Sequence, residues 1–294
     1  MLSSRSFINP ILKRDILVNS RNARMMVAIT LINILFAVIA GVLFATNRDA
    51  SYQTYYSNVA GIFPILAMSE IEIIALVIPI LTSTSISGER ERQTLEVMLT
   101  TPVKHGTIVL GKLMSAMVTT FMYVIATLPF IAVAFTVGGL DWKLLFQYLG
   151  IIVYLDIYIG SIGIFFSCIK RTSVSAAISA IVTVVAVVLI TYAAGKVCDS
   201  MMYTVNINSS SYGVYTAAKM TCYAINPVMW IADMIIRLMG DAPDVSVISN
   251  YGDYTAFVME HKCAISVCIN LCMAFIMLRI ASVKLIKGSR RNKG

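Results

Sequence analysis

Charged side chains are scarce in this chain of 294 residues, and their scarcity excludes a soluble fold. Asp, Glu, Lys and Arg make up 13% of the sequence, about half of the roughly 25% that is typical of soluble domains. Hydrophobic residues reach 58%, and the mean hydropathy is +0.82. A soluble domain of this length has no interior large enough to bury so much apolar surface. The composition therefore predicts an integral membrane protein.

The sequence also lacks the motifs of an enzyme. No G-x-x-x-x-G-K-[ST] phosphate-binding loop occurs, and the apolar surroundings of Gly111-Lys112 do not make one. H-E-x-x-H and G-x-S-x-G are absent, and no C-x-x-C or His-rich spacing indicates a metal site. We expect no catalytic residue, metal or cofactor in this chain. The net charge of +8 does not predict a nucleic-acid partner, because basic residues in membrane proteins are topology markers first.

Six apolar segments are long enough to cross a membrane, which takes about 20 residues. We therefore expect an all-α integral membrane protein with six transmembrane helices in a single domain over residues 1–294. The third segment is longer than a straight crossing needs, so either Pro129 breaks it or its first turns lie in the interface. The expected spans are Met25–Thr46, Phe63–Ile86, Ile108–Val137, Leu144–Cys168, Val174–Gly195 and Lys262–Leu285.

The distribution of Lys and Arg predicts the orientation of these spans. Of the 23 basic residues, 17 fall on the side that holds both termini. Cytoplasmic loops carry the excess of positive charge, so both termini are expected in the cytoplasm of a multi-pass plasma-membrane protein. The basic N-terminal region is too long for a secretory signal and precedes a full-length span.

Three segments outside the spans have a recognisable character. Residues 1–24 are either an interfacial amphipathic helix or a basic tail that only sets the topology. Residues 196–261 form an extracellular loop, in which the apolar stretch 227–239 is too short to span and suits a re-entrant or interfacial helix. Cys198 and Cys222 lie in this loop; they either pair in an oxidising compartment or stay free, because spacing alone does not show geometry.

Three carboxylates fall inside the expected spans, where charge is costly and usually faces a cavity or a partner. Glu70 and Glu72 are two residues apart, so on a helix they point in different directions. They either line a transport pathway or sit at headgroup depth. Asp156 lies near the middle of its span and either lines the pathway or bonds a serine or tyrosine on a neighbouring helix.

The densest group of charges lies between the second and third spans, in residues 87–106. Helical spacing puts Leu95, Met98 and Leu99 on one face and Glu89, Arg92 and Glu96 on another. This pattern predicts a short amphipathic helix, with one face against the bundle and the other free for a partner.

This segment resembles the cytoplasmic loop of the type-2 permeases of ATP-binding-cassette (ABC) exporters. The family pattern is an acidic-basic-acidic cluster, then Gly-Thr-Leu-Glu, apolar residues and Thr-Pro. The matching residues here are Glu89, Glu91, Thr94, Leu95, Glu96, Leu99, Thr101 and Pro102, with Gly111-Lys112 at the next helix. Gln93 stands where the family usually has glycine. The N-terminal stretch 9–15 and Asn226-Pro227 also resemble family segments.

The resemblance implies a half-transporter without its own ATPase. Two permease subunits, of the same or different chains, would pack together in the lipid membrane, and each would dock a cytosolic ABC ATPase that binds ATP and Mg. Docking would use the coupling helix between spans two and three. The residues expected to couple to the ATPase are Glu89, Arg90, Glu91, Arg92, Thr94, Leu95, Glu96 and Leu99.

The predicted function is thus a permease subunit, most simply of an exporter, whose cargo is amphipathic: a lipid, a peptide or a drug-like molecule. An autonomous secondary transporter is one alternative, although internal repeats are not evident. A membrane enzyme is a second, and a non-transporting sensor or scaffold subunit with the same loop is a third.

Overall fold

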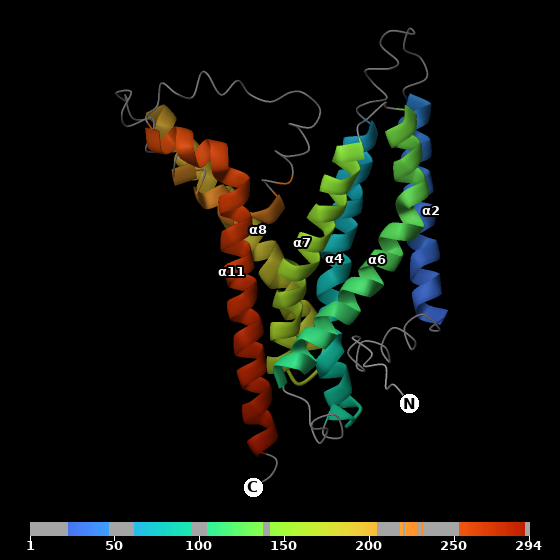
Figure 1. Cartoon of the computed structure of the whole chain (residues 1–294), viewed down its shortest axis with the longest axis vertical. Coiled ribbons are helices and arrows are strands. Elements are labelled where there is room, and N and C mark those ends of the chain that lie inside the picture. The colour runs from blue at the N-terminus through green and yellow to red at the C-terminus, as the bar shows by residue number, and fades with distance from the viewer. Residues whose placement is uncertain are drawn as a thin grey trace, which may run out of the picture. The chain divides into compact units, whose positions relative to one another are not determined.

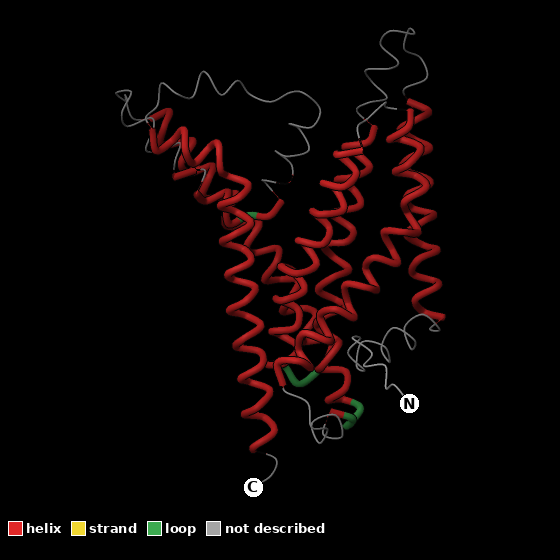
Figure 2. The backbone as a smooth tube through the Cα atoms, viewed as in Figure 1, coloured by secondary structure: helices red, strands yellow, loops and turns green. Residues whose placement is uncertain are grey.

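The computed structural model describes residues 23–46, 62–95, 105–137, 142–204, 218–219, 221–228, 231 and 253–291. Every regular element in these residues is a helix (Figures 1 and 2). The long helices are α2 (Ala23–Thr46), α4 (Ile62–Glu91), α6 (His105–Val137), α7 (Trp142–Ile169), α8 (Ser173–Thr204) and α11 (Asp253–Arg291).

All six helices are long and apolar enough to cross a membrane, as the sequence predicts. Their ends differ from the predicted spans. α4 continues past Ile86 to Glu91, α8 continues past Gly195 to Thr204, and α11 begins at Asp253. Hydropathy marks where apolar side chains stop, whereas backbone hydrogen bonding carries a helix on into polar sequence. The extra turns of α4 and α8 therefore lie in segments that we expected to be loops.

The chain divides into two compact units, and the first comprises residues 1–181 and 275–294. Its centre is the pair α4 and α7, which run side by side (Figure 1). A Cβ atom added to Gly163 would lie 1.9 Å from Thr82 Oγ1, and one added to Gly160 would lie 2.7 Å from a methyl of Leu113. Small residues thus permit the close approach of α7 to its neighbouring helices.

Helices α6 and α2 pack onto this central pair. α6 is continuous from His105 to Val137, so Pro129 lies within the helix and does not end it. Phe36 of α2 is fully buried and its ring lies 6.4 Å from that of Phe130. Elsewhere α2 exposes apolar side chains, among them Leu31 and Val38. Such a surface is stable in lipid and unfavourable in water.

The second unit, residues 182–274, is held together by polar contacts around a short segment, which we call the outer segment (residues 218–228). The fully buried Asn226 donates from Nδ2 to the carbonyl of Val188 in α8 at 3.2 Å. Ser266 of α11 donates to the carbonyl of Ala224 at 2.5 Å. Most of the predicted re-entrant stretch 227–239 lies outside the described residues, as does the predicted N-terminal helix 1–24 apart from residues 23 and 24, where α2 begins.

Candidate functional site

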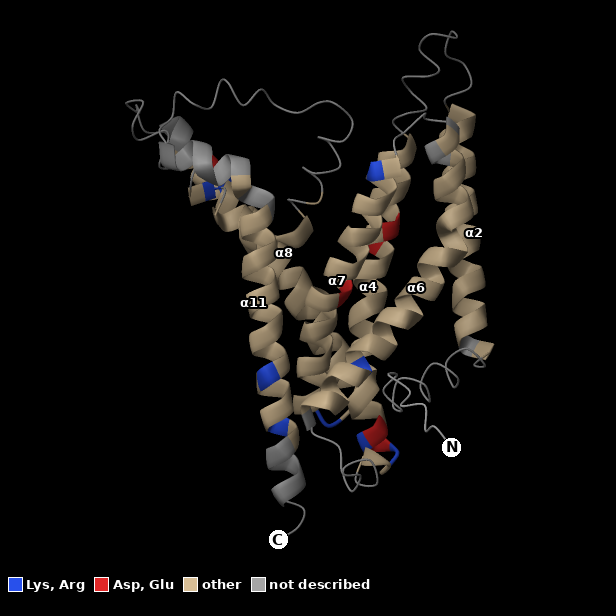
Figure 3. Ribbon diagram, in the orientation of Figure 1, with Lys and Arg blue, Asp and Glu red and all other residues tan. Residues whose placement is uncertain are grey.

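The charged segment after the second span begins as the last turn of α4 and then reverses direction. We call residues 89–95 the charged turn; Figure 3 shows charge of both signs gathered there. The reversal is held by the amides of Arg92, Gln93 and Thr94, which donate to the carbonyls of Gly88, Arg90 and Glu89. The predicted separate helix over residues 89–99 thus differs from the structure at its start. Glu96 and Leu99 lie outside the described residues.

Gln93 adopts a left-handed backbone conformation with φ of 59°. This conformation is unfavourable for a residue with a side chain and is the usual end of a helix that has glycine there. Gln93 is also the position at which the sequence departs from the glycine of the ABC permease pattern. Glutamine in place of glycine still allows the left-handed turn, but the backbone at Gln93 is strained.

Glu89 joins the charged turn to α6. Its Oε1 accepts a hydrogen bond from Lys112 Nζ at 2.6 Å, and the two side chains are 16% and 5% exposed. A buried cation of this kind requires an anion close by.

Gly106 and Gly111-Lys112 have the glycine spacing of a phosphate-binding loop, but Leu113 stands where the motif needs Ser or Thr, and the stretch is part of α6.

Arg90 joins the charged turn to the end of α7. Its guanidinium donates to the carbonyls of Lys170 at 2.5 Å and Cys168 at 3.0 Å. The last carbonyls of a helix have no partner within it and carry partial negative charge. Arg90 therefore satisfies backbone acceptors at the point where α7 ends.

Glu91 joins the charged turn to the start of α8. Its carboxylate accepts from the backbone N–H of Ser173 at 2.9 Å and from the hydroxyl of Ser173 at 2.5 Å. The first amides of a helix are unpaired and favour negative charge. Glu91 therefore caps a helix that begins 82 residues later in the chain.

Of the residues expected to couple to an ATPase, Glu89, Arg90 and Glu91 make the contacts just described with other helices. The side chains of Arg92 and Thr94 are exposed, as is that of Gln93 between them, whereas Leu95 is buried. The partners of the first three are residues that the sequence analysis did not assign: Lys112, Ser173 and the carbonyls at 168 and 170. The sequence could have indicated a role for Lys112, because it is the only charged residue in the apolar segment 108–137.

Leu95 anchors the far end of the charged turn. It is 8% exposed and belongs to an apolar cluster formed by four helices. The other buried members are Ile86, Ile108, Val109, Leu113, Ile164, Cys168, Ala281 and Leu285. An apolar side chain in such a cluster and polar bonds to three elements fix the charged turn relative to the helices around it.

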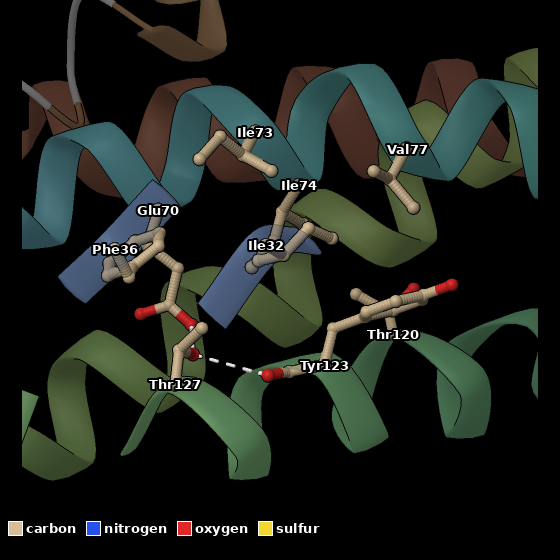
Figure 4. A pocket seen from close by; sticks show the side chains of 9 residues that line it. All are labelled: Ile32, Phe36, Glu70, Ile73, Ile74, Val77, Thr120, Tyr123 and Thr127. Atoms are coloured by element: carbon tan, nitrogen blue, oxygen red, sulfur yellow. Dashed lines mark hydrogen bonds between the residues drawn. The ribbon is translucent and has the colours of Figure 1, made fainter. Parts of the chain in front are cut away.

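The two carboxylates within the apolar part of α4, Glu70 and Glu72, are separated as their spacing predicts. Glu70 is buried at 2% exposure and accepts hydrogen bonds from the hydroxyls of Thr127 in α6 and Tyr148 in α7. Glu72 is exposed. Glu70 also lines a small pocket, drawn in Figure 4, whose other walls come from α2, α4 and α6. The pocket residues are Ile32, Phe36, Glu70, Ile73, Ile74, Val77, Thr120, Tyr123 and Thr127.

Asp156 lies one layer further along the same helices. Its side chain is 1% exposed and hydrogen-bonds with Thr120 of α6. This is a hydroxyl on a neighbouring helix, although not the Ser or Tyr that the sequence suggested. Among the described residues, the buried atoms without a hydrogen-bond partner include Asp156 Oδ2 and the hydroxyl of Tyr158. Unsatisfied polar atoms at this depth mark a position that packing alone does not explain.

Six apolar helices, with a charged turn that bonds to α6, to the end of α7 and to the start of α8, are the features of a multi-pass membrane protein of the transport-subunit type. The family model described as ABC-2 family transporter protein matches residues 10–279. The chain therefore belongs to the ABC-2 transporter family, and it is a membrane subunit of an ABC transporter. This family consists of permeases and is not catalytic, and it implies an ABC ATPase as partner. No curated protein sequence matches the chain.

Proposed function

We propose that the chain is an exporter permease that dimerises with a second permease subunit and couples ATP hydrolysis in a separate cytosolic ATPase to the movement of an amphipathic cargo. ATP and Mg are bound by that ATPase. Both termini and the charged turn lie in the cytoplasm, and the protein resides in the plasma membrane. This proposal rests on one observation: the charged turn is bonded to several helices at its base and is exposed to solvent at its tip.

The tip supplies the contact surface for the ATPase. Arg92, Gln93 and Thr94 are exposed, and they are followed by residues 96–104, which include the expected contacts Glu96 and Leu99. The base of the turn supplies the transmission. Glu89, Arg90 and Glu91 connect it to α6, to the end of α7 and to the start of α8. A displacement of the tip is then shared by three helices, which is the two-state coupling that transport requires.

The cargo pathway is proposed along the buried polar layer of α4, α6 and α7. Glu70 and Asp156 belong to this layer, whereas the exposed Glu72 sits at its edge. Apolar walls with few polar groups suit a lipid-like, peptide or drug-like molecule. An autonomous secondary transporter fits less well, because the anchored turn would then have no use.

Charge reversal at the tip tests the coupling proposal. The tagged chain is purified from its native membranes, and co-purified proteins are identified by mass spectrometry. We expect an ATPase with a phosphate-binding loop, and we expect Arg92→Glu to remove it while the chain still inserts. Lys143→Glu, an equally exposed reversal at the start of α7, is the matched control and retains the ATPase. Equal retention by both variants would refute the docking role of the tip.

A further inference from the structure

The outer segment packs against the end of α8 in a regular series of contacts. Asp199 Oδ1 accepts from Lys219 Nζ at 2.6 Å. One turn away, a Cβ atom added to Gly195 would lie 2.2 Å from the ring of Tyr223. Residues 195 and 199 of α8 therefore face residues 223 and 219 of the outer segment, which is the pattern of two antiparallel helices in contact.

Cys198 and Cys222 lie within this series. The two side chains hydrogen-bond to one another, and both thiols are free. The ion pair between Asp199 and Lys219 on one side and the Gly195–Tyr223 contact on the other hold the two helices in this register. A disulfide needs its two Cα atoms within about 7 Å, which contact between the side chains makes accessible.

We propose that Cys198 and Cys222 form a disulfide that fastens the outer segment to α8. The inference goes beyond the transport function, and it rests on the proposed orientation, which puts both residues on the extracytoplasmic side. The oxidant is the disulfide of an extracytoplasmic thiol–disulfide oxidoreductase. One cysteine attacks that disulfide, the second cysteine then resolves the mixed disulfide, and the oxidoreductase leaves as a dithiol with the two electrons and two protons.

The local environment slows oxidation of the pair without such an enzyme. Burial raises the pKa of the Cys222 thiol, and the adjacent Cys198 raises it further. Because the thiolate is the reactive species, a raised pKa slows the reaction without a strong oxidant. The same environment protects the finished bond, since a half-buried disulfide within a helix contact is difficult for reductants to reach.

Differential alkylation of the full chain in its native cells tests the proposal. Thiols are blocked with N-ethylmaleimide at lysis, and the denatured protein is labelled with a polyethylene-glycol maleimide before or after reduction. We expect reduction to release two additional reactive thiols, and we expect a cross-linked peptide containing residues 198 and 222. Cys198→Ser and Cys222→Ser each abolish the reduction-dependent shift, whereas Cys272→Ser in α11 leaves it unchanged.

Identical labelling of the wild type with and without reduction would overturn the disulfide. A second variant then shows whether the absence of a disulfide also means that the proposed membrane orientation is wrong. Ser200 is exposed at the end of α8, so Ser200→Cys in the Cys198→Ser background reports the side of the membrane. Cys222→Ser is added to this background so that the thiol at residue 200 is the one reporting; its reaction with an impermeant maleimide on intact cells would leave the proposed orientation standing, and protection of it would refute the orientation as well.

Discussion

Removal of Lys112 should release the charged turn from α6. At the observed separation of 2.6 Å, the attraction between Lys112 and Glu89 is about 6 kcal/mol for an effective dielectric constant of 20. Desolvation of two largely buried charges offsets much of this. Loss of only one partner leaves the other charge buried and uncompensated, which costs about 3–5 kcal/mol. We expect Lys112→Met to lower the free energy of unfolding by this amount.

A double-mutant cycle isolates the pair from the other contacts of either residue. Glu89→Leu alone is expected to destabilise for the same reason as Lys112→Met, because each leaves one unpaired charge. The double variant replaces both charges by apolar side chains of similar length, and it should lie close to the wild type. With about 3–5 kcal/mol for each single variant and little change for the double variant, the coupling free energy has a magnitude of about 6 kcal/mol or more, well above the roughly 0.5 kcal/mol scatter of independent sites.

The assay is equilibrium unfolding of the purified chain in mixed detergent and denaturing micelles, followed by helix content. Transport coupled to ATP hydrolysis is measured on the same variants in vesicles with the ATPase subunit. The double variant should fold yet couple poorly, because the connection between the turn and α6 is gone. Additive losses from the two single variants would refute the pairing, and full coupling in the folded double variant would refute its role in transmission.

Three further variants follow from local geometry. Gln93→Gly should stabilise the protein by about 0.5–1 kcal/mol, since it removes left-handed strain, whereas Thr94→Gly should destabilise it; thermal unfolding compares the two. Gly163→Ala should destabilise by about 1–3 kcal/mol through overpacking against Thr82, whereas Gly150→Ala meets no atom within 4 Å and should be neutral or stabilising in the same measurement. Asp156→Asn retains an oxygen for Thr120, so assembly should be normal and vesicle transport altered; wild-type transport would leave Asp156 a structural residue.

The helical architecture could be predicted from the sequence because one physical requirement dominates it. In lipid, every backbone polar group must be satisfied within the segment, so a long apolar run becomes a helix. The ends of the helices obey a different rule. α4 continues to Glu91 because hydrogen bonding extends beyond the apolar run, and it stops where Gln93 adopts positive φ. A glutamine does not by itself predict a positive φ. The one indication was that the family pattern has glycine at this position.

The site could be predicted only in part, because long-range pairing decides which charges are available. Alternation of acid and base identified residues 89–92 as a special segment, and helical spacing separated Glu70 from Glu72. The partners of Glu89 and Glu91 lie 23 and 82 residues away. Local spacing carries no information about such contacts. The sequence analysis therefore assigned all the charges of the turn to one group facing the ATPase, whereas the structure separates them into a base that bonds to other helices and an exposed tip.

The division into base and tip gives the charges of the turn two different physical roles. A charge at the base, such as Glu89, acts through the helix that it holds, so its loss weakens the connection and changes the stability of the isolated chain. A charge at the tip, such as Arg92, is exposed and interacts with the neighbouring Glu91, so its reversal should act chiefly on a partner. Stability measured without the ATPase should therefore respond to Glu89 and not to Arg92, while ATPase binding should respond to Arg92. A turn that failed this separation would be a simple solvated loop, and the motion of a bound ATPase would not pass through it to α6, α7 and α8.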